Sequence, residues 1–211
     1  MKYKLLSLNV GQPETYETEK GELKSAYRKK PVSTPAFLSY LNVEGDEQAD
    51  KKNHGGRDKA VCLYPAQHYR HWEEHYGQSF AFPSFGENIT VEGVSEKDVH
   101  IGDIFQLGEA LLQISEPRKP CYIIARTHGI DDFPAQVMKK GFTGFYLRVL
   151  KEGRVQAGDY FSLVESHPAG VTVDEVNQLR YHDKDNKELL EKVLRLEPLA
   201  EGLKETLKKR L

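Results

Sequence analysis

The spacing of glycines and apolar residues changes near Glu165, and this change limits the possible folds more than any other feature of the chain. Before it, short segments rich in β-branched and aromatic residues alternate with glycine turns, a pattern typical of strands. The predicted strands cover residues 4–10, 37–43, 60–64, 88–92, 104–107, 110–115, 145–150 and 154–157. We therefore predict a mainly β fold over residues 1–165, a β-barrel with peripheral helices.

Turn residues connect several of these segments. Residues 108–109 predict a hairpin between the two segments that flank them, and residues 151–153 predict a second hairpin in the same way. Residues 65–76 form the main predicted helix of this half, because Pro65 suits a helix start and Gly77 a helix end.

After Glu165, glycine turns become rare and helix signals appear. Thr172 with Glu175 matches a capping box, and Asp185 with Glu188 supplies a similar start for a second helix. A third helix is indicated by leucines spaced four residues apart, namely Leu199, Leu203, Leu207 and Leu211. Residues 166–211 are therefore predicted to form a small three-helix unit packed on the barrel or on itself. A module that recruits a partner or reads DNA is the alternative.

The composition limits the classes of protein to which the chain can belong. Of its 211 residues, 38% are hydrophobic and 29% are charged, and the formal net charge is −2. This charge gives no overall attraction to nucleic acid or anionic lipid, so we expect neither a nucleic-acid polymer nor a membrane as a partner. Two cysteines cannot make a disulfide framework, and no apolar run approaches the roughly 20 residues that span a bilayer. With no signal-peptide pattern at the N-terminus, the expected location is the reducing cytoplasm.

The two cysteines lie in different surroundings. Cys121 directly follows the segment Pro117-Arg118-Lys119-Pro120, in which two cations would favour the thiolate and Pro120 suits the first turn of a helix. Cys121 is therefore a candidate nucleophile or metal ligand; a small buried hydrophobe is the alternative. Cys62 lies in an apolar strand without a neighbouring cation, so we assign it to packing.

A second candidate site is the segment from His54 to Lys59, with the sequence HGGRDK. Paired glycines let a ligand approach the backbone, while Arg57 and Lys59 supply charge for an anion such as a phosphate. His54 would donate a hydrogen bond, and Asp58 would orient one of the two cations. The alternative is a tight turn that enters a strand, with both cations solvated, and the two glycines by themselves favour it.

Two further segments hold candidate polar residues. Glu87 and Asn88 follow a glycine at a turn and suit hydrogen bonds to the edge of a heterocycle, although turn chemistry explains them too. Arg148 lies in an otherwise apolar strand, on the face that it shares with Tyr146. An arginine there either lines a polar cavity or pairs with a carboxylate; Glu87, Asp103 and Asp159 are the candidate partners.

Taken together, these motifs resemble the MOSC family, which is named for the C-terminal domain of molybdenum cofactor sulfurases. The segments that carry the resemblance are His54–Val61, Phe85–Asn88, Ile101–Asp103, Pro117–Cys121, Gly144–Val149 and Gly158-Asp159. It runs from about residue 4 to residue 165. The helical tail resembles that of the stand-alone YiiM-like branch, which is associated with resistance to hydroxylaminopurine.

The resemblance implies a β-barrel that binds the molybdenum cofactor, with Cys121 as the ligand of molybdenum or sulfur. A soft thiolate suits molybdenum beside the sulfurs of the cofactor. The cations and His54 would hold the pterin and its phosphate, and Glu87 and Asn88 would contact the same cofactor. The cations in this set are Arg57, Lys59, Arg118 and Arg148. The implied activity is the reduction of N-hydroxylated bases or related N-hydroxylated compounds.

The chain lacks parts that larger members of the family carry, namely a pyridoxal-phosphate sulfurase domain and a cysteine cluster for an iron–sulfur centre. Reduction would therefore need a separate electron-donor protein. Two other functions stay open. Cys121 would carry a persulfide in a sulfur carrier, and a cofactor-binding module without turnover would use the same residues. The sequence leaves the oligomeric state and the physiological substrate open.

Overall fold

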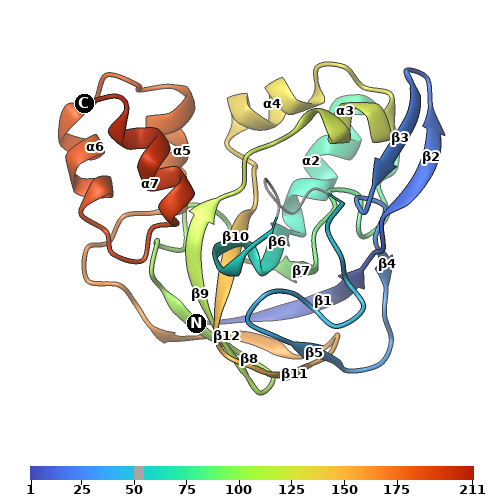
Figure 1. The fold of residues 1–211 in the computed structure, drawn as a ribbon, viewed down its shortest axis with the longest axis horizontal. Coiled ribbons are helices and arrows are strands. Elements are labelled where there is room, and N and C mark those ends of the chain that lie inside the picture. Colours follow the sequence, from blue (N-terminus) through green and yellow to red (C-terminus); the bar gives the residue numbers. More distant parts are fainter. Residues whose placement is uncertain (50–54) are drawn as a thin grey trace.

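The computed structural model describes residues 1–49 and 55–211 (Figure 1). In these residues, seven strands close into a barrel in the order β12-β8-β9-β10-β6-β7-β1, and β1 pairs with β12 to complete it. The strands are β1 (Lys2–Val10), β6 (Val61–Pro65), β7 (Ile89–Glu92), β8 (Ile104–Leu107), β9 (Ala110–Pro117), β10 (Phe145–Lys151) and β12 (Tyr160–Glu165). The predicted β-barrel is confirmed.

Five short strands lie outside this ring. They are β2 (Glu14–Thr18), β3 (Gly21–Ser25), β4 (Lys30–Pro31), β5 (Ala36–Leu38) and β11 (Gly153–Val155). β4 extends the sheet beside β1, and β2 with β3 forms a hairpin at one end of the molecule (Figure 1). The β2–β3 hairpin was not predicted, because its sequence alternates charged residues and threonines with few apolar side chains.

One predicted hairpin is confirmed and the other is wrong. β8 and β9 pair directly across residues 108–109, with Leu107 opposite Ala110. β11, however, pairs with β5 and not with β10. β10 pairs instead with β9 along most of its length and with β6 at Phe145–Leu147. The strand predicted over residues 37–43 is reduced to β5, because the chain turns back at Ser39, whose backbone N–H donates to the Asn42 carbonyl.

Three helices cover one end of the barrel: α2 (Gln67–Tyr76), α3 (Tyr122–His128) and α4 (Phe133–Lys140). α2 begins two residues later than predicted because Pro65 still belongs to β6. Its buried face carries Tyr69 and Trp72, which join an aromatic cluster separate from the barrel interior. Pro120 was predicted to lie in the first turn of a helix, but α3 begins two residues after it, at Tyr122, because Cys121 has an extended backbone and is the N-cap.

The tail forms α5 (Val173–Tyr181), α6 (Lys187–Leu194) and α7 (Glu201–Lys208). The capping box of Thr172 and Glu175 is present as predicted. The second helix is capped by Asn186, one residue after the predicted Asp185, because its side chain accepts a hydrogen bond from Leu189 N at 2.9 Å. The leucine stripe of α7 is buried except for Leu211 at the C-terminus.

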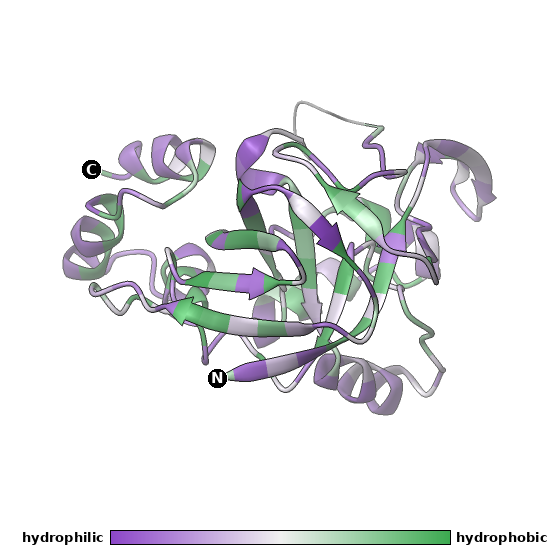
Figure 2. Ribbon diagram, turned by 90° about the horizontal axis from the view of Figure 1, so that it is seen from below, coloured by the Kyte–Doolittle hydropathy of each residue, from purple (hydrophilic) through white to green (hydrophobic). Residues whose placement is uncertain are grey.

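The buried apolar residues of the barrel and of the tail form one continuous cluster. Figure 2 shows hydrophobic residues concentrated on the barrel strands, while hydrophilic residues occupy much of the peripheral helices. The division of the chain at residue 165 stays a prediction. Among the described residues, no helix is long and apolar enough to cross a lipid bilayer.

Candidate functional site

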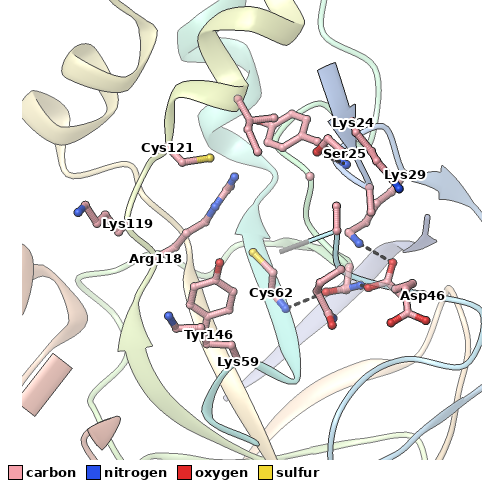
Figure 3. A pocket seen from close by; sticks show the side chains of 18 of the residues that line it. Lys24, Ser25, Lys29, Asp46, Lys59, Cys62, Arg118, Lys119, Cys121 and Tyr146 are labelled. Atoms are coloured by element: carbon pink, nitrogen blue, oxygen red, sulfur yellow. Dashed lines mark hydrogen bonds and ion pairs between the residues drawn. The ribbon is translucent and has the colours of Figure 1, made fainter. Parts of the chain in front are cut away.

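A cavity of about 230 Å³ opens at the helix-covered end of the barrel, and its described wall is rich in positive charge (Figure 3). The wall includes five cations, namely Lys24, Lys29, Lys59, Arg118 and Lys119. Two carboxylates, Asp46 and Glu47, also line it. The excess of cations suits an anionic ligand, although the whole chain has a net charge of −2.

Cys121 reaches this cavity from the end of the loop that joins β9 to α3. Its backbone is extended, with φ −120° and ψ 165°, and the chain enters α3 at the next residue. The side chain is half-buried, and Figure 3 shows its sulfur pointing toward the guanidinium of Arg118. A thiol that is both accessible and next to a cation is placed for nucleophilic attack or metal binding.

Arg118 forms the buried part of the cationic wall. Only 8% of it is exposed, and its backbone N–H donates to the Gly144 carbonyl at 3.0 Å. Burial lowers the pKa of its guanidinium, but the neighbouring Cys62 and Tyr27 side chains raise it, and the balance lies well above the usual value. Arg118 is therefore a permanent positive charge at the bottom of the cavity.

Lys59 is carried into the cavity by the 3₁₀ turn η1 (Arg57–Lys59). Its Nζ lies 3.6 Å from Glu116 Oε1 and 5.8 Å from the centre of the Tyr146 ring. Burial raises the pKa of Glu116, and the positive charge of Lys59 partly opposes this shift. Lys59 thus belongs to a partly buried charged pair at the rim of the cavity.

Asn88 joins three parts of the site. Its Oδ1 accepts a hydrogen bond from Cys62 N at 3.0 Å, and its Nδ2 donates to Asp46 Oδ2 at 2.9 Å. Asp46 also pairs with Lys29, and both side chains are buried. Lys29 and Asp46 were not predicted to belong to the site. Lys29 lies in a run of three basic residues, and only the fold shows which of them turns inward.

Three predicted site residues do not line the cavity. Arg57 lies over the ring of Tyr40, with 5.0 Å between the guanidinium carbon and the ring centre. Arg148 pairs with Asp58, at 2.7 Å between Nη2 and Oδ1, and not with any of the three carboxylates proposed from the sequence. Because Asp58 belongs to η1, Arg148 holds the turn that carries Lys59.

Glu87 is also separate from the cavity wall. It is fully buried and accepts hydrogen bonds from Tyr69, from Thr90 Oγ1 at 2.8 Å and from Phe85 N at 3.1 Å. Burial raises the pKa of its carboxyl group, and the hydrogen bond from Tyr69 opposes this shift. Glu87 therefore has a structural role in its contacts with these residues. His54 lies outside the described residues.

Cys62 has a place that the sequence did not predict. It is 6% exposed and belongs to β6, as expected for a packing residue, yet it lines the same cavity as Cys121 (Figure 3). Burial raises the pKa of its thiol to about 11, and the nearby charge of Arg118 only partly opposes this. The cavity thus presents two sulfurs in unlike environments. Within the described residues, no group of three or more His, Cys, Asp and Glu side chains is arranged to hold a metal ion.

Comparison with known proteins agrees with this architecture. A family described as MOSC domain matches residues 50–162, which is more than half of the chain. The chain belongs to the MOSC family. A second family, described as YiiM-like 3-alpha helix domain, matches residues 171–211. The MOSC match contains Cys121 and all the other predicted site residues.

Relatives of this MOSC protein include bacterial chains that it matches over most of their length. YflK of Bacillus subtilis (strain 168) is 43% identical over 201 residues, which cover 95% of this chain and 91% of YflK. The crystal structure of YiiM from Geobacillus stearothermophilus has a TM-score of 0.85 at 35% identity and covers 99% of both chains. A protein named reductase from Gibberella moniliformis (strain M3125 / FGSC 7600) is 36% identical over 149 residues, 69% of this chain but 26% of the fungal protein.

Proposed function

We propose that the cavity beside Cys121 binds the molybdenum cofactor and that the protein uses it to reduce N-hydroxylated bases or related N-hydroxylated compounds. The observation that carries this proposal is an accessible thiol in a cation-lined cavity of a MOSC protein. The similarity to a protein named reductase supports the class of reaction.

The residues of the cavity fit such a cofactor. Cys121 offers one soft sulfur donor, the kind of ligand that molybdenum takes up beside other sulfurs. Arg118, Lys119 and Lys59 would bind the phosphate that the pterin carries, because charge-assisted hydrogen bonds to phosphate are strong. The hydroxyl of Tyr27 is buried in the wall and makes no hydrogen bond within the described residues, so it is available to a polar ligand.

The predicted binding residues divide into two groups in this proposal. Arg118, Lys59 and Asn88 would contact the cofactor or shape the wall that it touches. Arg148 and Glu87 would act from behind the wall, Arg148 through Asp58 and Glu87 through its buried hydrogen bonds. Arg57 is assigned to the outer surface beside Tyr40.

The overall reaction consumes one N-hydroxylated compound, two electrons and two protons, and yields the amine and one water. When bound, the cofactor would supply the oxygen-accepting, two-electron chemistry. Cys121 would hold the metal, and the cations would orient the pterin. A separate electron-donor protein would supply the two electrons.

Molybdenum analysis joined with an activity assay tests the proposal. The protein is purified from cells that make molybdenum cofactor, and bound molybdenum, bound pterin and protein persulfide are measured. Reduction of hydroxylaminopurine is then followed with a chemical reductant in place of the donor protein. We expect molybdenum and pterin in near-equal amounts together with turnover.

Other outcomes select other functions. Persulfide on Cys121 without molybdenum would assign the protein as a sulfur carrier, an alternative that the half-buried thiol also permits. Bound cofactor without turnover would assign it as a binding module.

A further inference from the structure

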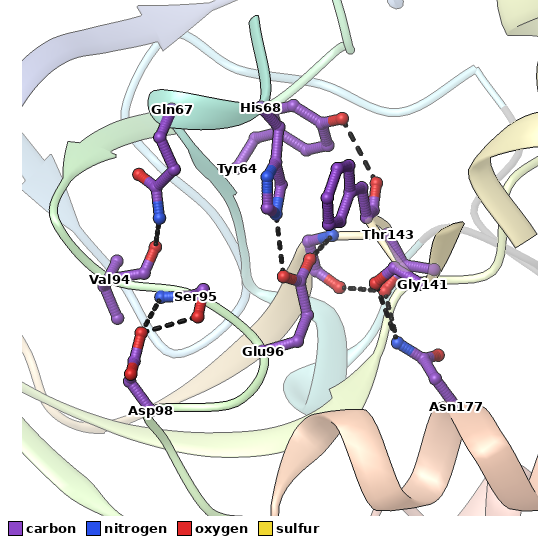
Figure 4. A network of polar contacts seen from close by, with 12 residues as sticks. Tyr64, Gln67, His68, Val94, Ser95, Glu96, Asp98, Gly141, Thr143 and Asn177 are labelled. Atoms are coloured by element: carbon purple, nitrogen blue, oxygen red, sulfur yellow. Dashed lines mark hydrogen bonds and ion pairs between the residues drawn. The ribbon is translucent and has the colours of Figure 1, made fainter. Parts of the chain in front are cut away.

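Helix α5 of the tail directs a polar side chain toward the barrel. Asn177 is fully buried, and its Nδ2 donates to Thr143 Oγ1 at 2.9 Å and to the Gly141 carbonyl at 3.3 Å. Figure 4 shows this side chain pointing from the helix at the connection between α4 and β10. The tail thus makes a specific polar contact with the barrel in addition to its apolar packing.

The same connection holds Arg118 in place. Thr143 Oγ1 donates to the Gly144 carbonyl at 2.8 Å, and this carbonyl also accepts the backbone N–H of Arg118 at 3.0 Å. On its other side, Gly144 N donates to Glu96 Oε1 at 2.7 Å. An unbroken series of hydrogen bonds therefore leads from Asn177 through Thr143 and Gly144 to Arg118.

Gly144 leaves little room for adjustment in this series. Its φ is +68°, and a Cβ at this position would lie 2.4 Å from the Leu63 carbonyl oxygen. No other residue type fits such a backbone without a shift. Since the backbone is fixed at Gly144, a change in the hydrogen bonds around it is passed on to its partners.

A second contact from the same helix reaches the neighbouring residue. Arg180 lies three residues after Asn177, hence on the same face of α5. Its Nη1 donates to the carbonyl of Pro117 at 3.1 Å. Pro117 and Arg118 share one peptide bond, so α5 holds its carbonyl directly through Arg180, while its N–H is held by the Gly144 carbonyl that Thr143 also contacts.

Packing alone does not explain an asparagine at position 177. Its neighbours on the buried face of α5 are Val173 and Val176, and its own Oδ1 is buried without a hydrogen bond among the described residues. An unsatisfied amide oxygen costs free energy that an apolar side chain of similar size avoids. The side-chain N–H of Asn177 therefore orients its hydrogen-bond partners more than it stabilises the fold.

We propose that Asn177 is a positioning residue for Arg118, so that the helical tail sets the electrostatic potential in the cavity. The three-helix segment then belongs to the functional site, although it contributes no residue to the described wall. The proposal concerns the cation and not the identity of the ligand, so it is independent of the proposed function.

The test compares two alkylating reagents on cofactor-free, full-length protein. Iodoacetate is an anion and iodoacetamide is neutral, and both react with the same thiolate of Cys121. The rate with iodoacetate divided by the rate with iodoacetamide therefore reports the local charge. This ratio is independent of the degree of ionisation of the Cys121 thiol. Mass spectrometry of the modified peptides separates Cys121 from Cys62. Asn177→Leu is the test variant and removes the hydrogen-bond donor without a change in charge. Arg118→Gln is the reference and gives the rate ratio in the absence of the cation.

We expect the ratio to fall about threefold in Asn177→Leu, the effect of one partly screened charge that moves away. Thr143→Val should give the same fall, because it removes the hydroxyl that links Asn177 to the Gly144 carbonyl. Gln178→Ala, on the exposed face of the same helix, should leave the ratio unchanged.

The double variant Asn177→Leu/Thr143→Val should show no further fall, because both changes interrupt one path. A wild-type ratio in folded Asn177→Leu would overturn the proposal. If that variant does not fold, Thr143→Val decides in the same way, and a wild-type ratio there overturns it.

Discussion

The two segments that bring sulfur to the cavity differ in almost every physical respect. Cys62 belongs to β6, which is paired on both sides, and is 6% exposed. Cys121 ends a loop rich in cations and is half-buried. Burial keeps Cys62 protonated at neutral pH, with a pKa of about 11. Both sulfurs lie near Arg118, so the difference between them is burial: the Cys62 thiol is buried, and the Cys121 thiol is accessible and hence the better candidate for a ligand.

The largest difference should appear on replacement of Cys121. Cys121→Ser keeps the size of the side chain but exchanges a soft donor for a hard, protonated one, so bound molybdenum should fall more than about 100-fold. Metal analysis of protein purified from cofactor-producing cells measures this. Retention of molybdenum and turnover at the wild-type level in folded Cys121→Ser would show that the thiolate is not the ligand.

The free energy of unfolding should depend on Cys62 at alkaline pH. The pKa of Cys62 is raised from 9.0 to about 11 in the folded protein, so the unfolded chain loses this proton first. Stability from this group is complete below pH 9 and is lost as the pH rises toward 11, by about 2 to 3 kcal/mol. Urea unfolding between pH 8 and 11 measures the loss. Cys62→Ala should show a shallower decline, and identical slopes would contradict this assignment.

Replacement of Cys62 at neutral pH should have a smaller effect. Cys62→Ala removes one buried sulfur and should lower the free energy of unfolding by about 1 to 2 kcal/mol. Its molybdenum content should fall far less than that of Cys121→Ser. Equal losses of molybdenum in the two variants would remove the distinction between the sulfurs.

The smallest effect is expected at the exposed cation next to the reactive loop. Lys119 is exposed, whereas Arg118 is buried beside it. Lys119→Ala should weaken retention of the phosphate-bearing pterin by about threefold, and the difference should disappear at high salt, because exposed charges are screened. Pterin fluorescence of the purified protein at two ionic strengths checks this. A loss that persists at high salt would place Lys119 in direct, desolvated contact.

Local signals predicted much of the barrel. The hairpin around residues 108–109 and the capping box at Thr172 depend on residues close together in the chain, and both are confirmed. β11 was assigned to the wrong partner because an edge strand pairs with whichever edge is free, and that depends on distant strands. The β2–β3 hairpin carried too weak an apolar pattern to be recognised.

The sequence predicted the kind of site, a thiol among cations, but only some of the residues that line it. The motifs pointed to Arg118, Lys59, Asn88 and Cys121, which do line one cavity. The same reasoning also selected Arg148, whose partner Asp58 lies 90 residues away in the chain. A sequence shows that an arginine in a strand needs a counter-charge or a cavity, and it does not show which one the fold supplies.

The sequence by itself determined the family, the barrel and the thiol next to two cations, because these follow from patterns among neighbouring residues. Only the tertiary structure decided which cations face the cavity, that Cys62 shares its wall, and that Asn177 of the tail donates to Thr143, next to the Gly144 carbonyl that accepts the Arg118 N–H. The reason is physical. The direction of a side chain and the partner of a buried polar group are set by packing between segments far apart in the chain, and local propensity contains no information about that packing.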